Sequence, residues 1–306
     1  MATREQALTT REAVARRLQG GGVDWRSMVL EALLLLSLLI SLGVLVVLLA
    51  DTLIKALPVL TDRPADFLTS PLSARAARAG IVQAIIGSLT VTILVVVTAL
   101  PIGIGAAIYL EEYSRDSRLA RFIRTNIRNL AGVPAIVYGL LGLAVFVTAL
   151  GLGSTALAGG LTLAILVLPI VVITTMEAIS AVPTAIREAA YGVGATRWET
   201  IRSHVLPYAA PGILTGTILS LARAFGETAP LLMVGAIAGT FSFVGAPWEQ
   251  LFEGYTTLPT IIYHWAGYPQ EEFRALGAAA IVVLLVVILL ANAAAVILRN
   301  RYDRKW

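Results

Sequence analysis

Six long runs of apolar residues are the dominant pattern along the chain. They cover roughly Met28–Leu53, Ile81–Leu110, Leu130–Leu150, Ala156–Ile179, Pro211–Ile237 and Leu276–Leu298. A helix needs about 20 residues to cross a bilayer, and hydrocarbon offers no partner for an unpaired backbone N–H or C=O. The pattern therefore predicts an all-α membrane protein with six transmembrane helices, which together form one membrane domain over residues 28–298.

Positive charge is distributed unevenly over the segments between these runs. Seventeen Arg and Lys residues precede the first run, follow the last, or lie between the second and third or the fourth and fifth; five lie in the alternate segments. Cytoplasmic loops of membrane proteins carry such an excess of basic residues. We therefore expect a multi-pass protein of the cytoplasmic membrane, with residues 1–27 as a cytoplasmic N-terminal segment, residues 299–306 as a cytoplasmic tail, and both termini in the cytoplasm.

Composition narrows the chemistry. The chain is 58% hydrophobic and 14% charged, whereas about 25% of the residues in soluble domains are charged. It has no cysteine and two histidines, so we expect no thiolate or histidine-rich metal site. The net charge of +4 sits in short segments between apolar runs, which favours a membrane topology signal over nucleic-acid binding.

The segment 180–210, between the fourth and fifth runs, has the pattern of two short helices. The first is predicted to begin at Pro183 and Thr184, and Gly192 and Gly194 are expected to end it with a left-handed turn. Thr196–Glu199 matches a capping box and predicts a second helix, which Leu206–Pro207 is expected to end. On spacing alone, two amphipathic helices that merely join the spans would explain this segment equally well.

Residues of this segment resemble the EAA loop of permeases from ATP-binding-cassette (ABC) importers. The shared pattern is a glutamate, paired alanines, a glycine and a Leu-Pro pair, here Glu188, Ala189, Ala190, Gly194, Leu206 and Pro207. One departure is His204, where an apolar residue is often found. The resemblance implies the architecture of a type I ABC-importer permease, with these six residues coupling the chain to an ATPase subunit.

Four further blocks narrow the resemblance to phosphate permeases of the PstA type. They are Pro101–Tyr113, Gly132–Gly142, Ala222–Leu232 and Leu258–Tyr263. The resemblance implies a subunit that translocates inorganic phosphate across the cytoplasmic membrane. It also implies four partner chains: a second permease of the PstC type, two ATPase subunits of the PstB type, and an external phosphate-binding protein of the PstS type.

The sequence contains no phosphate-binding loop of its own. Its two lysines, Lys55 and Lys305, do not follow the glycine pattern of such a loop. If transport is driven by ATP, then ATP and Mg²⁺ bind to the partner ATPase. We therefore expect this chain to be a transport subunit without a cofactor and without catalytic residues.

Arg223 and Glu227 are the only full charges well inside a predicted span. A charge there costs about 2.5–3.5 kcal/mol or more, and the spacing of four places both side chains on one helical face. One interpretation is a structural ion pair that neutralises itself. The other is a substrate pathway, in which Arg223 binds an oxyanion with its forked guanidinium, while Glu227 accepts the proton of hydrogen phosphate and repels sulfate.

Three hydroxyl side chains near this pair complete the candidate pathway. Thr217, Ser220 and Thr228 would add hydrogen-bonding groups for a bound anion. Lone hydroxyl residues in a span more often bond the preceding helical turn, which leaves a purely structural role open for each.

Other classes of transporter and enzyme fit the sequence less well. A permease for another oxyanion, such as sulfate or molybdate, is the closest alternative. An ion-coupled secondary transporter would show buried acidic or histidine side chains in several spans, whereas only Glu227 is deep, and Asp51 and Glu177 lie near span ends. A membrane enzyme would need clustered acid, base or metal-binding groups, and none cluster.

The charge asymmetry predicts which loops face the cytoplasm. Because the chain has no cysteine, single cysteines can be introduced as unique labels. Ser117→Cys and Ser203→Cys should be protected from an impermeant thiol reagent added outside intact cells, whereas Ser242→Cys should react. Labelling of the Ser117 variant from outside would contradict the orientation.

Overall fold

The computed structural model describes residues 25–114, 117–236 and 248–302. Within these ranges the chain is helical and contains no strand, which confirms the all-α prediction. Of the predicted N-terminal segment 1–27, the last three residues are described; they belong to a helix that begins at Trp25. The end of the predicted tail, like Ser242, lies outside the described residues.

The chain divides into two units, Met1–Ile54 and Lys55–Trp306. Helix α2 (Trp25–Asp62) begins in the first unit and ends in the second. Within the first unit it is a run of exposed aliphatic side chains, long and apolar enough to cross a membrane. This confirms the predicted first span and extends it at both ends.

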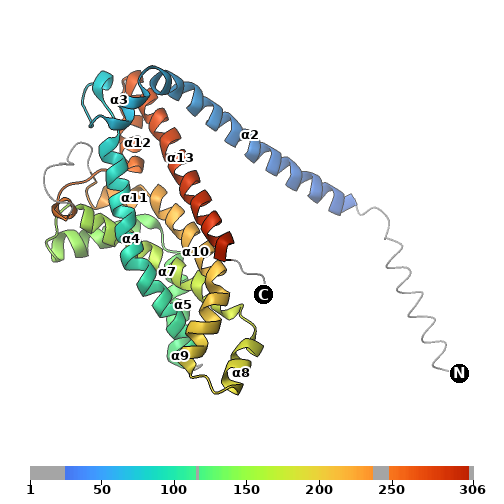
Figure 1. Ribbon diagram of the computed structural model, residues 1–306. Coiled ribbons are helices and arrows are strands. Elements are labelled where there is room, and N and C mark those ends of the chain that lie inside the picture. Colours follow the sequence, from blue (N-terminus) through green and yellow to red (C-terminus); the bar gives the residue numbers. More distant parts are fainter. Residues whose placement is uncertain (1–24, 115–116, 237–247, 303–306) are drawn as a thin grey trace. The chain divides into compact units, whose positions relative to one another are not determined.

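The second unit contains the other described helices (Figure 1). In chain order they are α3 (Pro64–Thr69), η1 (Ala76–Arg78), α4 (Val82–Ile108), η2 (Tyr109–Tyr113), α5 (Arg118–Ala131), α6 (Ala135–Gly142), η3 (Leu143–Ala149), α7 (Ala156–Ser180), α8 (Thr184–Gly192), α9 (Arg197–Thr200), η4 (Ile201–Val205), α10 (Leu206–Gly226), α11 (Ala229–Met233), η5 (Glu249–Phe252), α12 (Leu258–Ala266) and α13 (Glu271–Tyr302). The predicted second, fourth and last spans correspond to α4, α7 and α13.

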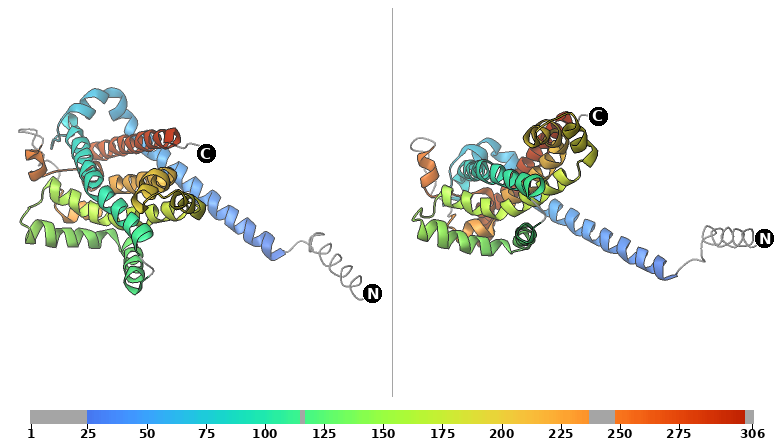
Figure 2. Two further views of the ribbon diagram at one scale, coloured as in Figure 1. Left: turned by 60° about the horizontal axis from the view of Figure 1, so that its bottom comes forward. Right: turned by 90° about the horizontal axis from the view of Figure 1, so that it is seen from below.

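The predicted third span, Leu130–Leu150, is bent rather than straight. The axes of α5 and of the α6–η3 segment differ by 101°, and the bend can be followed in Figure 2. It lies just before Pro134, whose ring removes a backbone donor and disfavours helical geometry at the preceding residue. The described part of the chain therefore has five helices that qualify as spans, and six if this bent pair crosses the membrane as one.

The predicted fifth span, Pro211–Ile237, is not one helix. α10 ends at Gly226, Glu227 is extended with φ −74° and ψ 126°, and the short α11 follows. Pro230 lies in the first turn of α11, where the missing N–H of proline costs no helical hydrogen bond. The break therefore lies beside Glu227 and Pro230, two residues that do not interrupt the apolar pattern enough to be predicted as a break.

The prediction that Leu206–Pro207 ends the second helix of the 180–210 segment was wrong. α9, the π-helical turn η4 and α10 form one 30-residue helix, Arg197–Gly226. A proline in a helix interior removes one hydrogen bond and crowds the preceding turn. The wider turn of η4, immediately before Pro207, accommodates this loss without ending the helix.

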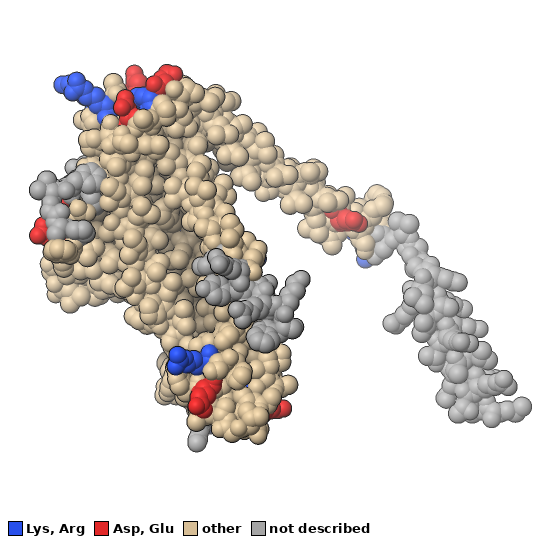
Figure 3. Space-filling view, in the orientation of Figure 1, with Lys and Arg blue, Asp and Glu red and all other residues tan. Residues whose placement is uncertain are grey.

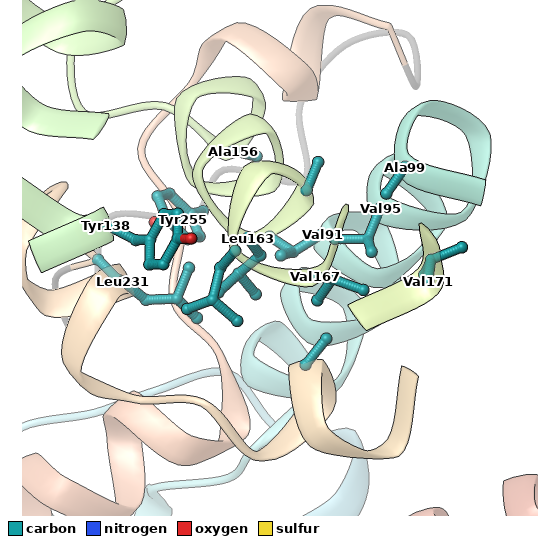
Figure 4. Close-up of a cluster of buried hydrophobic side chains, with 14 residues drawn as sticks. Val91, Val95, Ala99, Tyr138, Ala156, Leu163, Val167, Val171, Leu231 and Tyr255 are labelled. Atoms are coloured by element: carbon teal, nitrogen blue, oxygen red, sulfur yellow. The ribbon is translucent and has the colours of Figure 1, made fainter. Parts of the chain in front are cut away.

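Helix α7 lies at the centre of the second unit and packs along α4 and α10. The main core cluster joins Val91 and Val95 of α4 to Leu163 and Val167 of α7, with Tyr255 buried beside them (Figure 4). Small residues permit the close approach; Gly160, for example, lies against the side chain of Leu94. Close contact between small residues and a facing helix is a main source of helix association in lipid.

Charged side chains gather at the two ends of the second unit. On the face shown in Figure 3, acidic and basic atoms lie near α3 at one end and near α8 and α9 at the other; the surface between them is largely uncharged, apart from acidic atoms at the left edge. This separation fits a protein whose middle faces hydrocarbon. It also fits a position of α8 and α9, which contain the resemblance to the EAA loop, at a membrane surface.

Two glycines of α4 should respond oppositely to replacement by alanine. A Cβ at Gly87 would overlap the carbonyl oxygen of Thr256, whereas nothing lies within 4 Å of one at Gly105. Gly87→Ala should cost about 1–3 kcal/mol through overpacking, and Gly105→Ala should be neutral or stabilise by about 0.5–1 kcal/mol. Heat-induced unfolding of the detergent-purified chain measures both; equal melting temperatures would refute the close contact at Gly87.

Candidate functional site

The segment between α7 and α10 forms the predicted helix, turn and helix. Gly194 has a φ of +87°, a left-handed conformation that glycine adopts without strain. Thr196 and Glu199 form a complete capping box at the start of α9. The hydrogen bonds that Glu199 accepts from the backbone and side chain of Thr196 lower the pKa of its carboxyl group.

The outer surface of this segment combines apolar and acidic groups. Val193 is 86% exposed, and Tyr191 and Trp198 are also exposed. Glu188 and Ala189 are also exposed, whereas Ala190 is buried. We call the exposed residues Glu188, Ala189, Tyr191, Val193 and Trp198 of this segment the coupling face; their exposed apolar side chains suit a protein partner.

The two remaining residues of the predicted coupling set differ in burial. Leu206 is half-buried and packs against a cluster that contains Ile179 and Val205. Pro207 is exposed, in the first turn of α10. Of the six predicted coupling residues, the structure therefore exposes Glu188, Ala189, Gly194 and Pro207, buries Ala190 and half-buries Leu206.

An ion pair that sequence reasoning missed holds the coupling face in place. Arg187 Nη2 lies 2.7 Å from Glu112 Oε1 at the end of α4–η2, and Arg187 Nε lies 3.1 Å from the same oxygen. Arg187 also donates to the carbonyl oxygens of Ile179 and Val182. Its side chain is 19% exposed and that of Glu112 is 7% exposed, so water screens the pair little.

Arg187 therefore joins three elements. It donates to the carbonyl oxygen of Ile179 in the last turn of α7 and to that of Val182 just after the helix, and it fastens α8 to the end of α4. Glu112 and Arg187 are 75 positions apart, and no local pattern pairs residues at that distance. The available signal was the position of both charges just outside apolar runs, at the same predicted membrane surface.

A second arginine fastens α9 to the same point. Arg197 donates to the carbonyl oxygen of Glu112, and its guanidinium carbon lies 5.0 Å from the ring centroid of Tyr113, a cation–π contact. Both short helices of the loop are thus attached to η2. Displacement of the coupling face would act directly on the end of α4.

The second candidate region is the break after α10. Arg223 Nε lies 3.2 Å from Glu227 Oε1, and the side chains are 56% and 18% exposed. The predicted proximity of the two residues is confirmed, but their setting differs from the predicted one. Glu227 caps the end of α10 instead of lying inside a continuous helix, and Arg223 is on the outer surface of the isolated chain.

The structure brings together only part of the predicted pathway set. Ser220 is buried and donates to the carbonyl oxygen of Gly216 at 2.7 Å, so its hydroxyl is used within the helix. Thr217 is six positions before Arg223, which on an α-helix is about 240° around the axis; the two side chains therefore point to different sides. Thr228, which follows Glu227 directly, is half-buried at the break.

Irregular backbone at membrane depth has a specific requirement. It persists where protein or a water-filled cavity surrounds it, because lipid leaves its polar groups without partners. The extended Glu227 beside an exposed arginine meets this description if the outer side of α10 faces a partner or a pathway. Within the described residues, no group of three or more His, Cys, Asp or Glu side chains could hold a metal ion.

Comparison with known proteins agrees with this arrangement. Residues 99–304 match the family described as "Binding-protein-dependent transport system inner membrane component". Two solved relatives share the fold: a bacterial ABC transporter that imports the acidic polysaccharide alginate, and the inward-facing MetNI methionine ABC transporter. The first has a TM-score of 0.63 with 17% identity, over 92% of this chain and 99% of that chain. The second has a TM-score of 0.60 with 19% identity, over 73% and 96%.

Proteins found by sequence similarity have a higher sequence identity to this chain than the two solved structures do. The chain is 37% identical to a probable ABC transporter permease, YqgI of Bacillus subtilis, over 56% of this chain and 58% of that protein. It is 37% identical to the phosphate transport system permease PstA of Mycobacterium leprae, over 60% and 59%. It is 35% identical to PstA of Haemophilus influenzae, over 74% and 76%. The chain thus spans less than two thirds of the first two relatives.

The residues that match the family model include the coupling face, the Glu112–Arg187 pair and the break after α10. The solved structures share the helical architecture. The chain therefore belongs to the family of binding-protein-dependent transport system inner membrane components.

Proposed function

We propose that the chain is one permease subunit of an ABC importer that translocates inorganic phosphate across the cytoplasmic membrane. Family membership supports a transport role, and relatives named as phosphate permeases support phosphate as the substrate. The observation that carries the choice of an anion is the Arg223–Glu227 pair. It combines an exposed guanidinium with a less exposed carboxylate at a break in a membrane-spanning helix.

This assignment implies a set of partners. A second permease of the PstC type would cover the outer side of α10, and two PstB-type ATPases would bind ATP and Mg²⁺ and dock on the coupling face. A PstS-type protein would deliver phosphate from outside. Both termini would be cytoplasmic, on the side of α8 and α9.

The chemistry of the pair suits hydrogen phosphate. Arg223 presents a planar fork of donors that matches two oxygens of an oxyanion. Glu227 Oε1 already accepts from Arg223, and a carboxylate in that position accepts a further hydrogen bond from the proton that hydrogen phosphate carries. Sulfate has no such proton at neutral pH, so the carboxylate repels it.

Coupling would pass through Arg187. When the ATPases move the coupling face, the bonds from Arg187 and Arg197 to η2 move the end of α4, and the bonds to Ile179 and Val182 move the end of α7. α7 packs along α10, which carries Arg223. A continuous helix from Arg197 to Gly226 adds a direct mechanical connection between the loop and the break.

Separating Glu112 from Arg187 should uncouple ATP hydrolysis from uptake. Glu112→Gln should strand a poorly hydrated arginine and destabilise the subunit by about 3 kcal/mol. The Glu112→Gln, Arg187→Met double variant should regain stability, because neither charge is then stranded, but not coupling. The measurement is phosphate transported per ATP hydrolysed by the reconstituted complex, with Arg202→Gln, an exposed charge of the same loop, as the control. A normal ratio in the double variant would contradict this role.

The Arg223–Glu227 pair should determine both uptake and anion choice. Arg223→Gln should abolish phosphate uptake while the complex still assembles, and Arg223→Lys should restore only part of it, because an ammonium lacks the fork. Glu227→Gln should keep some phosphate uptake and lower the discrimination against sulfate. Initial uptake of radiolabelled phosphate and sulfate at matched expression measures these effects across the double-mutant cycle.

The same cycle separates a substrate site from a structural ion pair. A purely structural pair should tolerate removal of both charges better than removal of one. Full phosphate uptake by the Arg223→Gln, Glu227→Gln double variant would therefore refute the pathway role. Sulfate uptake that exceeds phosphate uptake in the unaltered complex would instead assign the importer to another oxyanion.

A further inference from the structure

Helix α5 lies beside the coupling region and takes no part in the transport chemistry described above. One side of α5 packs against the protein: Ala120 is buried, and Ile123 and Ile127 contact a cluster built from α4 and α7. Arg124 also turns inward, where it donates to the carbonyl oxygen of Leu110 and pairs with Glu111 at 3.5 Å. The rest of the helix surface is exposed.

One exposed flank of α5 is apolar. Leu119 is 67% exposed, Phe122 is 66% exposed and Leu130 is 46% exposed. At 100° per residue these three positions fall within about 80° around the helix axis. We call them the apolar flank; the exposed Asn126 falls in the same arc, where its amide donates to the carbonyl oxygen of Phe122.

The other exposed flank is basic. Arg118, Arg121 and Arg128 also fall within about 80° around the axis, on the opposite side of the packed stripe; we call them the basic flank. All three residues are exposed. The sequence of α5 contains four arginines and no acidic residue, whereas the coupling face and its surroundings mix arginines with Glu188 and Glu199.

The position of α5 fits the surface of a bilayer. It follows the end of α4–η2 and meets the α6–η3 segment at 101°, so α5 runs along the membrane surface if that segment crosses the membrane. Amphipathic helices that lie in the interface place Phe and Leu on one face and Lys or Arg on the other. The two flanks of α5 follow this arrangement.

We propose that α5 is an interfacial helix that binds anionic phospholipid headgroups on the cytoplasmic side of the membrane. The apolar flank enters the acyl region, and the basic flank, including Arg118 and Arg128, binds the phosphodiester groups of the lipids. The occupant is a lipid surface rather than a protein for two reasons. All the charged residues of α5 are arginines, and the bend joins α5 directly to the apolar segment α6–η3. A bound lipid would also steady Glu111 and the end of α4 through Arg124.

The first test locates the flanks. Phe122→Cys and Thr125→Cys place a nitroxide on the apolar flank and beside the basic flank, respectively, in a chain that has no cysteine of its own. The complex is assembled with cysteine-free partners in vesicles of phosphatidylcholine and phosphatidylglycerol. The label at 122 should be more accessible to oxygen than to a water-soluble nickel chelate, and the label at 125 should show the reverse. A label at 122 that is more accessible to nickel would overturn the proposal.

The second test measures lipid selectivity. Spin-labelled phosphatidylglycerol should associate with the complex more strongly than spin-labelled phosphatidylcholine, and Arg118→Gln with Arg128→Gln should lower that preference by up to about fivefold per arginine removed. The control, Arg75→Gln with Arg78→Gln, removes the same charge from the exposed η1 at the other end of the unit. With the labelled lipids in the cytoplasmic leaflet, this control should leave the preference for phosphatidylglycerol unchanged. An equal loss in both variants would overturn the proposal.

The ATPase is the remaining possible occupant, and the same labels identify it. If α5 docks on the ATPase, the label at 122 becomes shielded from both oxygen and nickel only when the ATPase subunits are present. That result would overturn lipid binding. Accessibility that is unchanged by the ATPase supports it, whatever anion the importer carries.

Discussion

Hydrocarbon offers no hydrogen-bond partner to the backbone, and the architecture of this chain follows from that constraint. Every long apolar run forms helix, because helix satisfies N–H and C=O groups within the segment. The two interruptions lie before Pro134 and at Glu227, the residue that follows α10 and comes shortly before Pro230 in the first turn of α11.

Close packing turns these helices into one mechanical unit. Gly160 and other small residues bring α7 against α4, and interfaces of this kind are packed too tightly to deform continuously. Arg187 connects this packed unit to the coupling loop, because its guanidinium contacts both helix ends. In the proposed function, a force on the loop would reach α4 and α7 through these contacts.

The two ion pairs differ in what their surroundings allow. Glu112 and Arg187 are both largely buried in the single chain and neutralise each other there. The pair therefore needs no partner subunit to balance its charges. Arg223 is more than half exposed, and an exposed arginine on a membrane helix needs another protein surface, water or an anion beside it. This difference in exposure is why we assign a structural role to the Glu112–Arg187 pair and propose a substrate role for Arg223.

The sequence by itself determined the helical class, the order of the apolar segments and the local cap and turn signals. Apolar run lengths located α4, α7 and α13, and the capping box at Thr196 and the left-handed Gly194 followed from residue type. These features depend on neighbours within a few positions, which a sequence displays directly. The family resemblance also followed from short blocks of adjacent residues.

Only the tertiary structure decided the remaining features. Glu112 and Arg187 meet because α4 and α7 pack side by side, and a sequence does not display that distance. Thr217 and Ser220 lay beside Arg223 in sequence, yet helix rotation and the hydrogen bond to Gly216 direct them elsewhere. Pro207 stays within a helix because the wider turn of η4 precedes it, and α10 ends at Gly226 with Glu227 extended; this backbone geometry is not visible in the order of residues.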